Sequence, residues 1–207
     1  RLRRLETVRR DFVANVSHEL KTPLTVVRGF AETLVDDDPP TEVRRQFAQS
    51  IVGHTRRMQR LVDDLLDLSR IESGGWVPVP ESVDFAAALA DLVSAARATA
   101  DRKGIRLDVT LATDAQSLCA DPTALRQVVG NLVENAVRHT SAGGVTLFTT
   151  REHGGVTVGV RDTGCGISGE HLPRIFERFY RVDPARSREQ GGTGLGLSIV
   201  KHLVDAH

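Results

Sequence analysis

The stretch FVANVSHELKTPLTVVRGFAETL (residues 12–34) decides the N-terminal fold. At 100° per residue, seven of its apolar side chains fall within an arc of about 120° on a helical wheel. They are Phe12, Val16, Leu20, Leu24, Val27, Ala31 and Leu34. One continuous stripe predicts an amphipathic helix over residues 1–35. The run DDDPP at residues 36–40 ends it, because charged residues and two prolines cannot continue a helix.

A second long helix is expected from about residue 42 to residue 71, with Thr41 as its N-cap. Residues three and four apart form the seam of a coiled coil: Ile51, His54, Met58, Leu61, Leu65 and Leu68. Two long helices joined by a short turn make an antiparallel hairpin. A hairpin this thin cannot bury its stripe alone. We therefore expect a homodimer through residues 1–72, with two hairpins forming a four-helix bundle.

A linker is expected at residues 73–80, where glycines and prolines interrupt the helical pattern. The remainder, residues 81–207, mixes two periodicities. Helices are expected over 84–101, 122–139 and from Gly194 onward, and strands over 105–109, 117–120, 145–150 and 156–161, with a hairpin turn at 153–155 and an irregular loop at 168–193. This order predicts an α/β sandwich with helices packed on one sheet face. The fold class of the whole chain is therefore α+β.

The composition excludes several classes. The chain has 207 residues, of which 40% are hydrophobic and 26% charged, as in globular proteins. Its 27 basic residues balance 27 acidic ones, which disfavours a nucleic-acid partner. Cys119 and Cys165 are too few for a disulfide scaffold, and no apolar stretch predicts a membrane span or a signal peptide. Residues 1–10 carry five Arg and one Glu, which suits either a solvated helix face or a segment beside anionic lipid.

His18 lies at about 240° on the wheel, opposite the apolar stripe, so its ring is expected in solvent. Thr22 follows one turn later and Glu19 is its neighbour in sequence. A largely neutral imidazole beside a carboxylate can act as a nucleophile with its general base. An ordinary surface histidine gives the same pattern, and the wheel alone favours that interpretation.

Three polar segments in the second half can bind a nucleotide. Asn131, Asn135 and Arg138 share one helix face, where amide oxygens and a guanidinium suit Mg²⁺ and phosphates. Residues 162–167 follow a strand, and Asp162 can accept a hydrogen bond from an adenine amino group. Residues 191–197 open a helix, whose N–H groups favour phosphate. A solvated face, a tight turn and a flexible loop are the plainer interpretations of the three segments.

In this order, the segments resemble the five sequence boxes of a sensor histidine kinase of two-component signalling. The H box is similar to residues 12–24, the N box to 131–136, the G1 box to 162–167, the F box to 175–181 and the G2 box to 192–197. The residues leading to His18 resemble the phosphate-sensing and envelope-stress-sensing kinases most. The resemblance covers nearly the whole chain, and five ordered boxes are highly specific.

The resemblance implies a histidine-phosphotransfer hairpin over residues 1–72 and a catalytic ATP-binding domain over 81–207. His18 would attack the γ-phosphate of ATP, Glu19 would be its base or hydrogen-bond orienter, and Thr22 would position water when the partner is dephosphorylated. Asn135 would be the Mg²⁺ ligand. The other expected ATP-binding residues are Asn131, Arg138, His139, Asp162, Gly164, Gly166, Gly192, Gly194, Leu195 and Gly196.

The resemblance also implies partners and a location. The phosphoryl group would pass to an aspartate on the receiver domain of a response regulator. A sensor region would precede Arg1, so the full-length protein is expected in a bacterial inner membrane with this portion in the cytoplasm. The ATP domain is expected to be truncated, because the family continues past His207 into further strands. A degenerate kinase serving as a scaffold and an ATPase of the gyrase and chaperone class are the competing hypotheses.

Overall fold

The computed structural model describes residues 2–152, 154–183 and 192–207. The chain divides into two compact units, Arg1–Asp67 with Arg178–Leu195, and Leu68–Glu177 with Gly196–His207. Parts of three expectations lie outside the described residues: the start of the basic segment, His153 in the hairpin turn, and residues 184–191 of the irregular loop. Among the described residues, no helix combines the length and the apolar character needed to cross a membrane.

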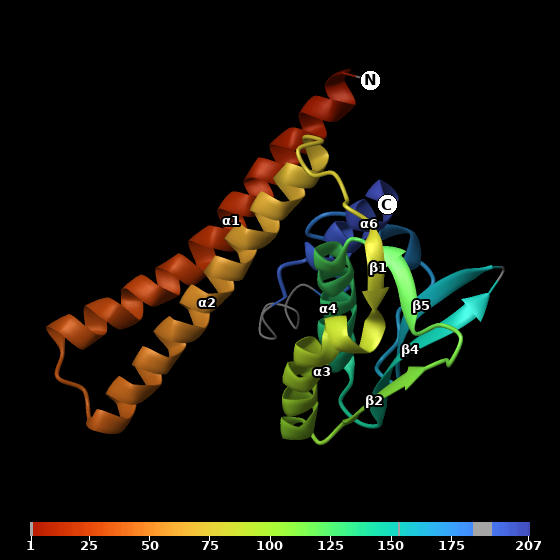
Figure 1. Cartoon of the computed structure of the whole chain (residues 1–207). Coiled ribbons are helices and arrows are strands. Elements are labelled where there is room, and N and C mark those ends of the chain that lie inside the picture. The colour runs from red at the N-terminus through yellow and green to blue at the C-terminus, as the bar shows by residue number, and fades with distance from the viewer. Residues whose placement is uncertain (1, 153, 184–191) are drawn as a thin grey trace. The chain divides into compact units, whose positions relative to one another are not determined.

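The first unit contains the expected helical hairpin, which Figure 1 shows as two long neighbouring helices. Helix α1 spans Leu2–Asp36 and helix α2 spans Thr41–Glu72. Near the turn, the rings of Phe30 and Phe47 stack with their centroids 4.7 Å apart. The expected cap is wrong by one residue. Arg44 N–H donates to the carbonyl of Pro40 at 3.0 Å, so Pro40 holds the cap position and Thr41 is already helical.

The second unit is built on a three-stranded sheet of order β2-β4-β5. Strand β2 (Arg106–Leu111) is parallel to β4 (Gly144–Glu152), and β4 is antiparallel to β5 (Gly155–Asp162). The short strands β1 (Glu81–Asp84) and β3 (Ser117–Ala120) pair separately. Strand β1 was not expected, because only one of its four residues is buried and no alternation precedes α3.

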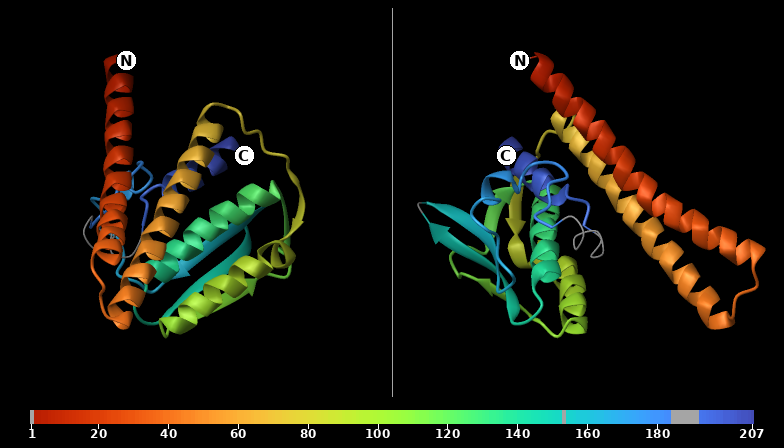
Figure 2. Two further views of the ribbon diagram at one scale, coloured as in Figure 1. Left: turned by 90° about the vertical axis from the view of Figure 1, so that its left-hand side faces the viewer. Right: turned by 180° about the vertical axis from the view of Figure 1, so that it is seen from behind.

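Helices α3 (Phe85–Arg102) and α4 (Pro122–His139) pack on one face of this sheet, as expected, and α6 (Gly196–Ala206) packs against α4 (Figure 2). Helix α6 starts two residues later than the sequence predicts, and a short 3₁₀ turn spans Leu172–Arg174. Inward side chains of β4 meet the apolar side of α4 in one core, which includes Val145, Leu147, Val129, Val133 and Phe85. The core fixes α4, the helix that carries the expected asparagine row.

Candidate functional site

His18 lies on α1 with its side chain exposed to solvent, as the helical wheel predicts. Thr22, one turn on, is also exposed, and its Oγ1 donates a hydrogen bond to the carbonyl of His18 at 3.2 Å. Pro23 follows and is buried. The hairpin therefore presents the imidazole outward, where an incoming electrophile can reach it.

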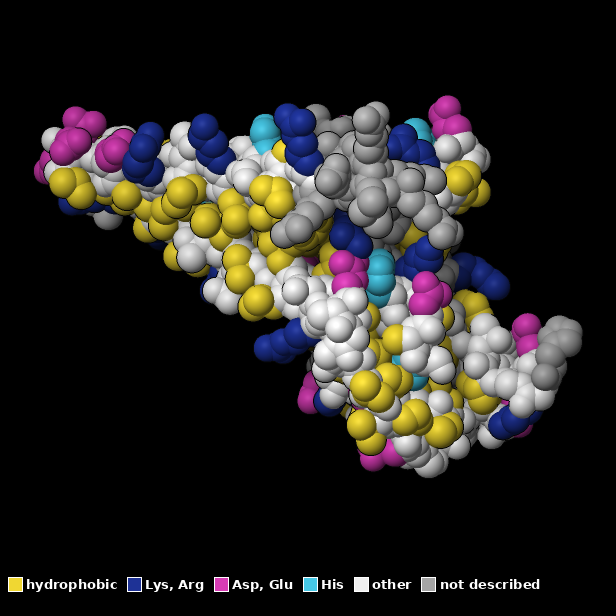
Figure 3. All heavy atoms as spheres, turned by 90° about the horizontal axis from the view of Figure 1, so that it is seen from above, with side chains coloured by type: hydrophobic (Ala, Val, Ile, Leu, Met, Phe, Trp, Pro, Cys, Tyr) yellow, Lys and Arg dark blue, Asp and Glu magenta, His cyan; other side chains and the backbone are white. Residues whose placement is uncertain are grey.

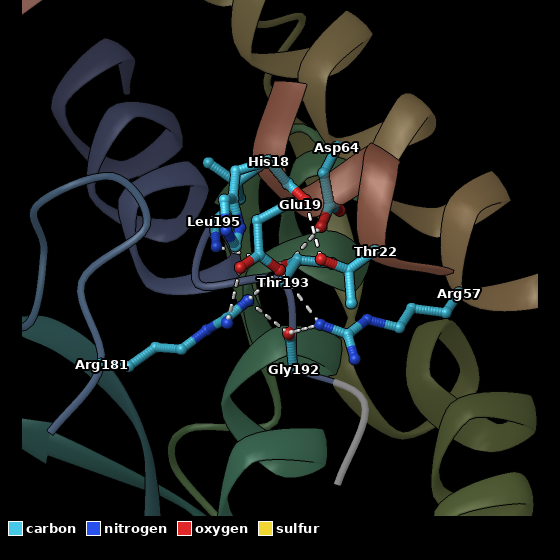
Figure 4. Close-up of polar contacts among 9 residues, drawn as sticks. All are labelled: His18, Glu19, Thr22, Arg57, Asp64, Arg181, Gly192, Thr193 and Leu195. Atoms are coloured by element: carbon cyan, nitrogen blue, oxygen red, sulfur yellow. Dashed lines mark hydrogen bonds and ion pairs between the residues drawn. The ribbon is translucent and has the colours of Figure 1, made fainter. Parts of the chain in front are cut away.

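Glu19 is enclosed by two arginines (Figure 4). Arg181 donates two hydrogen bonds to its carboxylate, from Nη1 to Oε1 at 3.0 Å and from Nη2 to Oε2 at 2.9 Å. From α2, Arg57 Nη2 donates to Oε2 at 3.0 Å. The Glu19 side chain is only 13% exposed and that of Arg181 7%. Two-pronged contacts between ions at low exposure are stronger than surface pairs, so the position of Glu19 is well defined.

The same two arginines hold the first glycine of residues 192–197. The carbonyl of Gly192 accepts from Arg181 Nη2 at 2.7 Å and from Arg57 Nη2 at 3.4 Å. Thr193 Oγ1 donates to Asp64 Oδ2 at 2.8 Å, which adds a second anchor on α2. Within this unit, Gly192, which is expected to bind nucleotide, is therefore held by the same two arginines as Glu19, the residue that follows His18.

Gly194 and Leu195 are fixed by close packing in the same segment. The φ angle of Gly194 is +74°, and a Cβ there would lie 2.9 Å from the Cα of Phe179. Its carbonyl also accepts from Phe179 N–H at 2.8 Å. Leu195 is fully buried. Only glycine fits position 194, because both the backbone angle and the available space exclude a side chain.

Arg57 and Arg181 are not among the site residues that the sequence predicts. Arg181 lies in the segment similar to the F box, but nothing local shows what it contacts. Arg57 had a usable signal. It lies as far after Asp38 as Glu19 lies before it, and residues equally distant from the turn of an antiparallel hairpin face each other.

In the second unit, α4 is fixed at both ends. Asp121 caps its start, accepting from Thr123 N–H at 2.9 Å and Ala124 N–H at 3.0 Å. The N–H groups of Ala124 and Val79 hold the pKa of the Asp121 carboxyl below its ordinary value, although burial opposes them. At the other end, Thr140 donates to the carbonyl of Ala136 through its N–H and its Oγ1. The asparagine row therefore sits on a rigid helix.

Asn131 meets the start of α6. Its Nδ2 donates to the carbonyl of Gln127 at 3.0 Å, and its Oδ1 lies 2.7 Å from where a Cβ on Gly196 would be. Asn135 and Arg138, further along α4, are both partly exposed, and His139 is exposed at the helix end. Glycine at 196 thus lets α6 begin against the amide oxygen of Asn131.

Asp162, at the end of β5, forms the tight turn that the plainer interpretation predicts. Its Oδ1 accepts from Gly164 N–H at 2.8 Å, and Asp162 is exposed. A Cβ on Gly164 would lie 2.6 Å from the carbonyl oxygen of His139, so the turn packs tightly on the end of α4. Gly166 has a φ of +68°, a conformation that favours glycine. The turn therefore packs on the end of the helix that carries the asparagine row.

Family models match both halves of the chain. The His Kinase A (phospho-acceptor) domain matches residues 8–74, and the histidine kinase-, DNA gyrase B- and HSP90-like ATPase domain matches residues 120–207. The first match contains His18, Glu19 and Thr22, and the second contains the α4 row and the Asp162 turn. The chain belongs to the sensor histidine kinases.

Two curated relatives align with this chain over nearly its whole length. It is 41% identical to the phosphate regulon sensor protein PhoR of Pseudomonas aeruginosa, over 100% of this chain and 47% of that protein. It is 40% identical to the sensor-like histidine kinase SenX3 of Mycolicibacterium smegmatis, over 99% of this chain and 53% of that protein. The chain thus spans about half the length of these curated relatives.

A solved structure agrees in fold. The structure of full-length ShkA in complex with AMPPNP matches with a TM-score of 0.69 and 32% identity, covering 95% of this kinase chain and 41% of that one. The match spans both the hairpin and the α/β unit. The likeness therefore holds for the order and type of the elements across the chain.

The residues of the kinase fit ATP with Mg²⁺. Mg²⁺ prefers oxygen ligands and retains water and phosphate oxygens in its shell, so it needs few protein ligands. Asn135 and Asn131 offer amide oxygens on α4. In the part of the chain that the structure describes, no cluster of three His, Cys, Asp or Glu side chains forms a cage for a metal. Arg138 also lies on this helix, in an ion pair with Glu134.

Proposed function

We propose that the chain is the catalytic core of a protein histidine kinase, which phosphorylates His18 from ATP and passes the phosphoryl group to an aspartate of a response regulator. The observation that carries the proposal is the exposed His18 within a match to the phospho-acceptor domain. The proposed organisation is a phosphotransfer hairpin over residues 1–72, a linker over 73–80 and a catalytic domain over 81–207.

His18 supplies the nucleophile in this mechanism. A neutral ring nitrogen attacks the γ-phosphorus, the P–N bond forms, and the bond to the β-phosphate oxygen breaks as ADP leaves. Glu19 accepts the hydrogen bond, and then the proton, of the other ring nitrogen as the ring gains positive charge. Arg57 and Arg181 fix the Glu19 carboxylate through the contacts described above. To act as a base, Glu19 must give up part of its pairing with these arginines and accept a hydrogen bond from His18 in its place.

The second unit binds and orients the donor. ATP supplies the phosphoryl group, and Mg²⁺ offsets the negative charge of its phosphates. Asn135 is the proposed Mg²⁺ ligand, with Asn131 beside it. Asp162 accepts from the adenine amino group. The phosphate and ribose contacts are assigned to Arg138 and His139, and Gly164, Gly166 and Gly196 shape this part of the site. Gly192, Gly194 and Leu195, which belong to the first unit, remain proposed nucleotide-binding residues.

The hairpin supports the proposal that the kinase is a homodimer. Its helices leave large apolar side chains exposed: Val13, Leu24, Val35, Val52, Val62 and Leu66. Figure 3 shows hydrophobic side chains gathered along the hairpin. A second hairpin would cover them in a four-helix bundle. The proposal also places this portion in the bacterial cytoplasm, following an inner-membrane anchor upstream of Arg1.

Labelled ATP tests the phosphotransfer. The wild-type protein is expected to acquire an acid-labile label and His18→Gln none, because a carboxamide is not a nucleophile. Thr22→Ala is the matched control on the same exposed face. It is expected to keep the label but to lose dephosphorylation of the response regulator, because Thr22 positions the attacking water. All three proteins should melt alike, since exposed substitutions change stability by less than about 0.5 kcal/mol.

Three results would contradict the proposal. A wild-type protein that binds ATP but acquires no label is a scaffold. A His18→Gln variant that hydrolyses ATP at the wild-type rate, with no label in either protein, indicates an ATPase of the gyrase and chaperone class. A label that persists in His18→Gln moves the phosphoacceptor to another residue.

A further inference from the structure

Lys103, which follows α3, has its ammonium group fully engaged. Its Nζ donates to the carbonyls of Val137 at 2.6 Å, Arg138 at 2.9 Å and Thr140 at 2.9 Å. An ammonium group has three protons, so three acceptors saturate it. Although Lys103 is an exposed residue, its charged end is therefore a fixed part of the structure.

The backbone of Lys103 is fixed as well. Lys103 N–H donates to the carbonyl of Ala100 at 2.9 Å, and Ile105 N–H donates to the same carbonyl at 3.1 Å. Between them Gly104 adopts a φ of +69°, as helix ends of this kind require. Ile105 is 3% exposed and anchors the turn in the core. The backbone from which the Lys103 side chain extends is therefore fixed.

The three acceptors belong to the end of α4. Carbonyls in the last turn of a helix lack partners within the helix, and the helix dipole makes that end negative. Thr140 satisfies the carbonyl of Ala136, and Lys103 satisfies those of Val137, Arg138 and Thr140. One cation therefore satisfies three of the carbonyls at the end of α4.

The remaining carbonyl of this turn faces the Asp162 turn. A Cβ on Gly164 would meet the oxygen of His139 at 2.6 Å, so Gly164 lies directly against that carbonyl. Gly164 N–H in turn bonds Asp162 Oδ1 at 2.8 Å. On the other side, Thr163 Oγ1 donates to the carbonyl of Ala142 at 3.0 Å and accepts from Gly144 N–H at 3.0 Å. Lys103, the α4 end and the Asp162 turn form one continuous stack.

We propose that Lys103 is a positioning residue for adenine recognition, because it holds the end of α4 on which the Asp162 turn packs. The inference rests on the proposed function, in which Asp162 accepts from the adenine amino group. All acceptors of the Lys103 ammonium lie on residues 137–140, so Lys103 acts on Asp162 only through the helix end. Loss of Lys103 should therefore weaken base recognition more than phosphate recognition.

The test uses Lys103→Met, which keeps a long side chain and removes the charge. Lys201→Met is the matched control, because Lys201 is exposed on α6 and has no role in the proposed site. Dissociation constants for ATP, GTP and tripolyphosphate are measured by competition against a fluorescent ATP analogue. GTP lacks the 6-amino group and tripolyphosphate lacks a base. Thermal melting defines a temperature at which every variant is folded.

The expected result is a preference for ATP over GTP about fivefold smaller in Lys103→Met, the effect of weakening one hydrogen bond to a charged group. Affinity for tripolyphosphate should fall less than affinity for ATP, because Lys103 holds the backbone carbonyl of Arg138 and not its guanidinium. Lys201→Met should match the wild type. A merely structural role would lower the melting temperature but leave the nucleotide preference of the folded protein intact, and that result overturns the inference.

Lys103→Arg covers the case in which Lys103→Met does not fold. The guanidinium keeps the charge at the helix end but cannot direct three protons of one nitrogen to three carbonyls. A reduced ATP preference in folded Lys103→Arg supports the inference, and the wild-type preference overturns it. A wild-type protein that does not prefer ATP overturns the assignment of Asp162 itself, which separates failure of the proposed function from failure of the role of Lys103.

Discussion

The exposed face of α1 and the end of α4 carry the two halves of the proposed chemistry in different ways. His18 and Thr22 are exposed on α1, and glycines of the hairpin such as Gly29 have open space around them. Around α4, by contrast, Gly164 lies against backbone. The hairpin can therefore change its reactive residues without a cost to folding. In the second unit, the proposed ATP-binding unit (here the ATP unit), the residues that shape the site also hold the fold together.

Glu19 is the exception that most sharply challenges this comparison, because it lies on the hairpin but is largely buried between Arg57 and Arg181. Glu19→Gln keeps the shape and removes the base. We expect phosphorylation of His18 to slow by about 100-fold, or about 2.7 kcal/mol in the activation barrier, as is typical for loss of a general base. Single-turnover labelling measures this rate.

Glu32→Gln is the control for Glu19→Gln, since Glu32 is an exposed glutamate on the same helix, paired with Arg28. It should label at the wild-type rate. A labelling rate for Glu19→Gln within about threefold of wild type would contradict the role of Glu19 as base. In that case the two arginines, and the segment they hold, would be the only reason for a carboxylate at this position.

Gly164→Ala tests the other half of the comparison. The added Cβ would lie 2.6 Å from the backbone oxygen of His139, which cannot move without the α4 end. We expect a loss of about 2 kcal/mol in the free energy of unfolding of the ATP unit, within the range for overpacked sites. We also expect weaker ATP binding. Urea unfolding and nucleotide titration measure the two effects.

Gly29→Ala is the matched substitution in the hairpin, where a Cβ would meet no atom within 4 Å. Alanine is the better helix former, so this variant should gain about 0.8 kcal/mol. A lower free energy of unfolding for Gly164→Ala and a higher one for Gly29→Ala would confirm that the two regions differ in their tolerance of an added side chain. Equal effects would show that the ATP unit tolerates substitution at its turn as well as the hairpin does.

The sequence predicts well those features that depend on local periodicity or local caps. The apolar stripe from Phe12 to Leu34 predicts α1, and Asp121 before Pro122 predicts the start of α4, because both signals lie within a few residues. The contacts of Arg57, Arg181 and Lys103 join segments far apart in the chain, so no local pattern predicts them. The acceptors of Lys103 are backbone carbonyls, which every residue type has, so the residue types do not reveal them. Strand β1 is too short for alternation to show. The predicted N-cap, Thr41, is one residue too late, because Pro40 can also occupy the cap position.

Asp121→Asn separates the two ends of α4. The N–H groups of Ala124 and Val79 lower the pKa of the Asp121 carboxyl from its ordinary value of 3.8. A carboxyl with a lowered pKa in the folded state contributes stability above its unfolded pKa and loses it as the pH falls through the folded pKa. We expect Asp121→Asn to cost about 1 kcal/mol at pH 7, because the amide nitrogen that replaces Oδ2 cannot accept the hydrogen bond from Val79 N–H. The gap from wild type should narrow as the pH falls below about 4, because the Asp121 carboxyl is then protonated in the unfolded chain while it is still ionised in the folded protein.

Urea unfolding from pH 7 to pH 3.5 measures this gap for Asp121→Asn, and Asp84→Asn serves as the control. Asp84 caps α3 from an exposed position and accepts from Ala87 N–H at 2.7 Å. A gap that stays constant down to pH 3.5 would contradict the lowered pKa of Asp121. Because Asp121 holds the start of α4 and Lys103 its end, Asp121→Asn should reduce stability without changing the preference for ATP over GTP. Loss of that preference in Asp121→Asn would show that adenine recognition depends on the whole helix and not on the end that Lys103 holds.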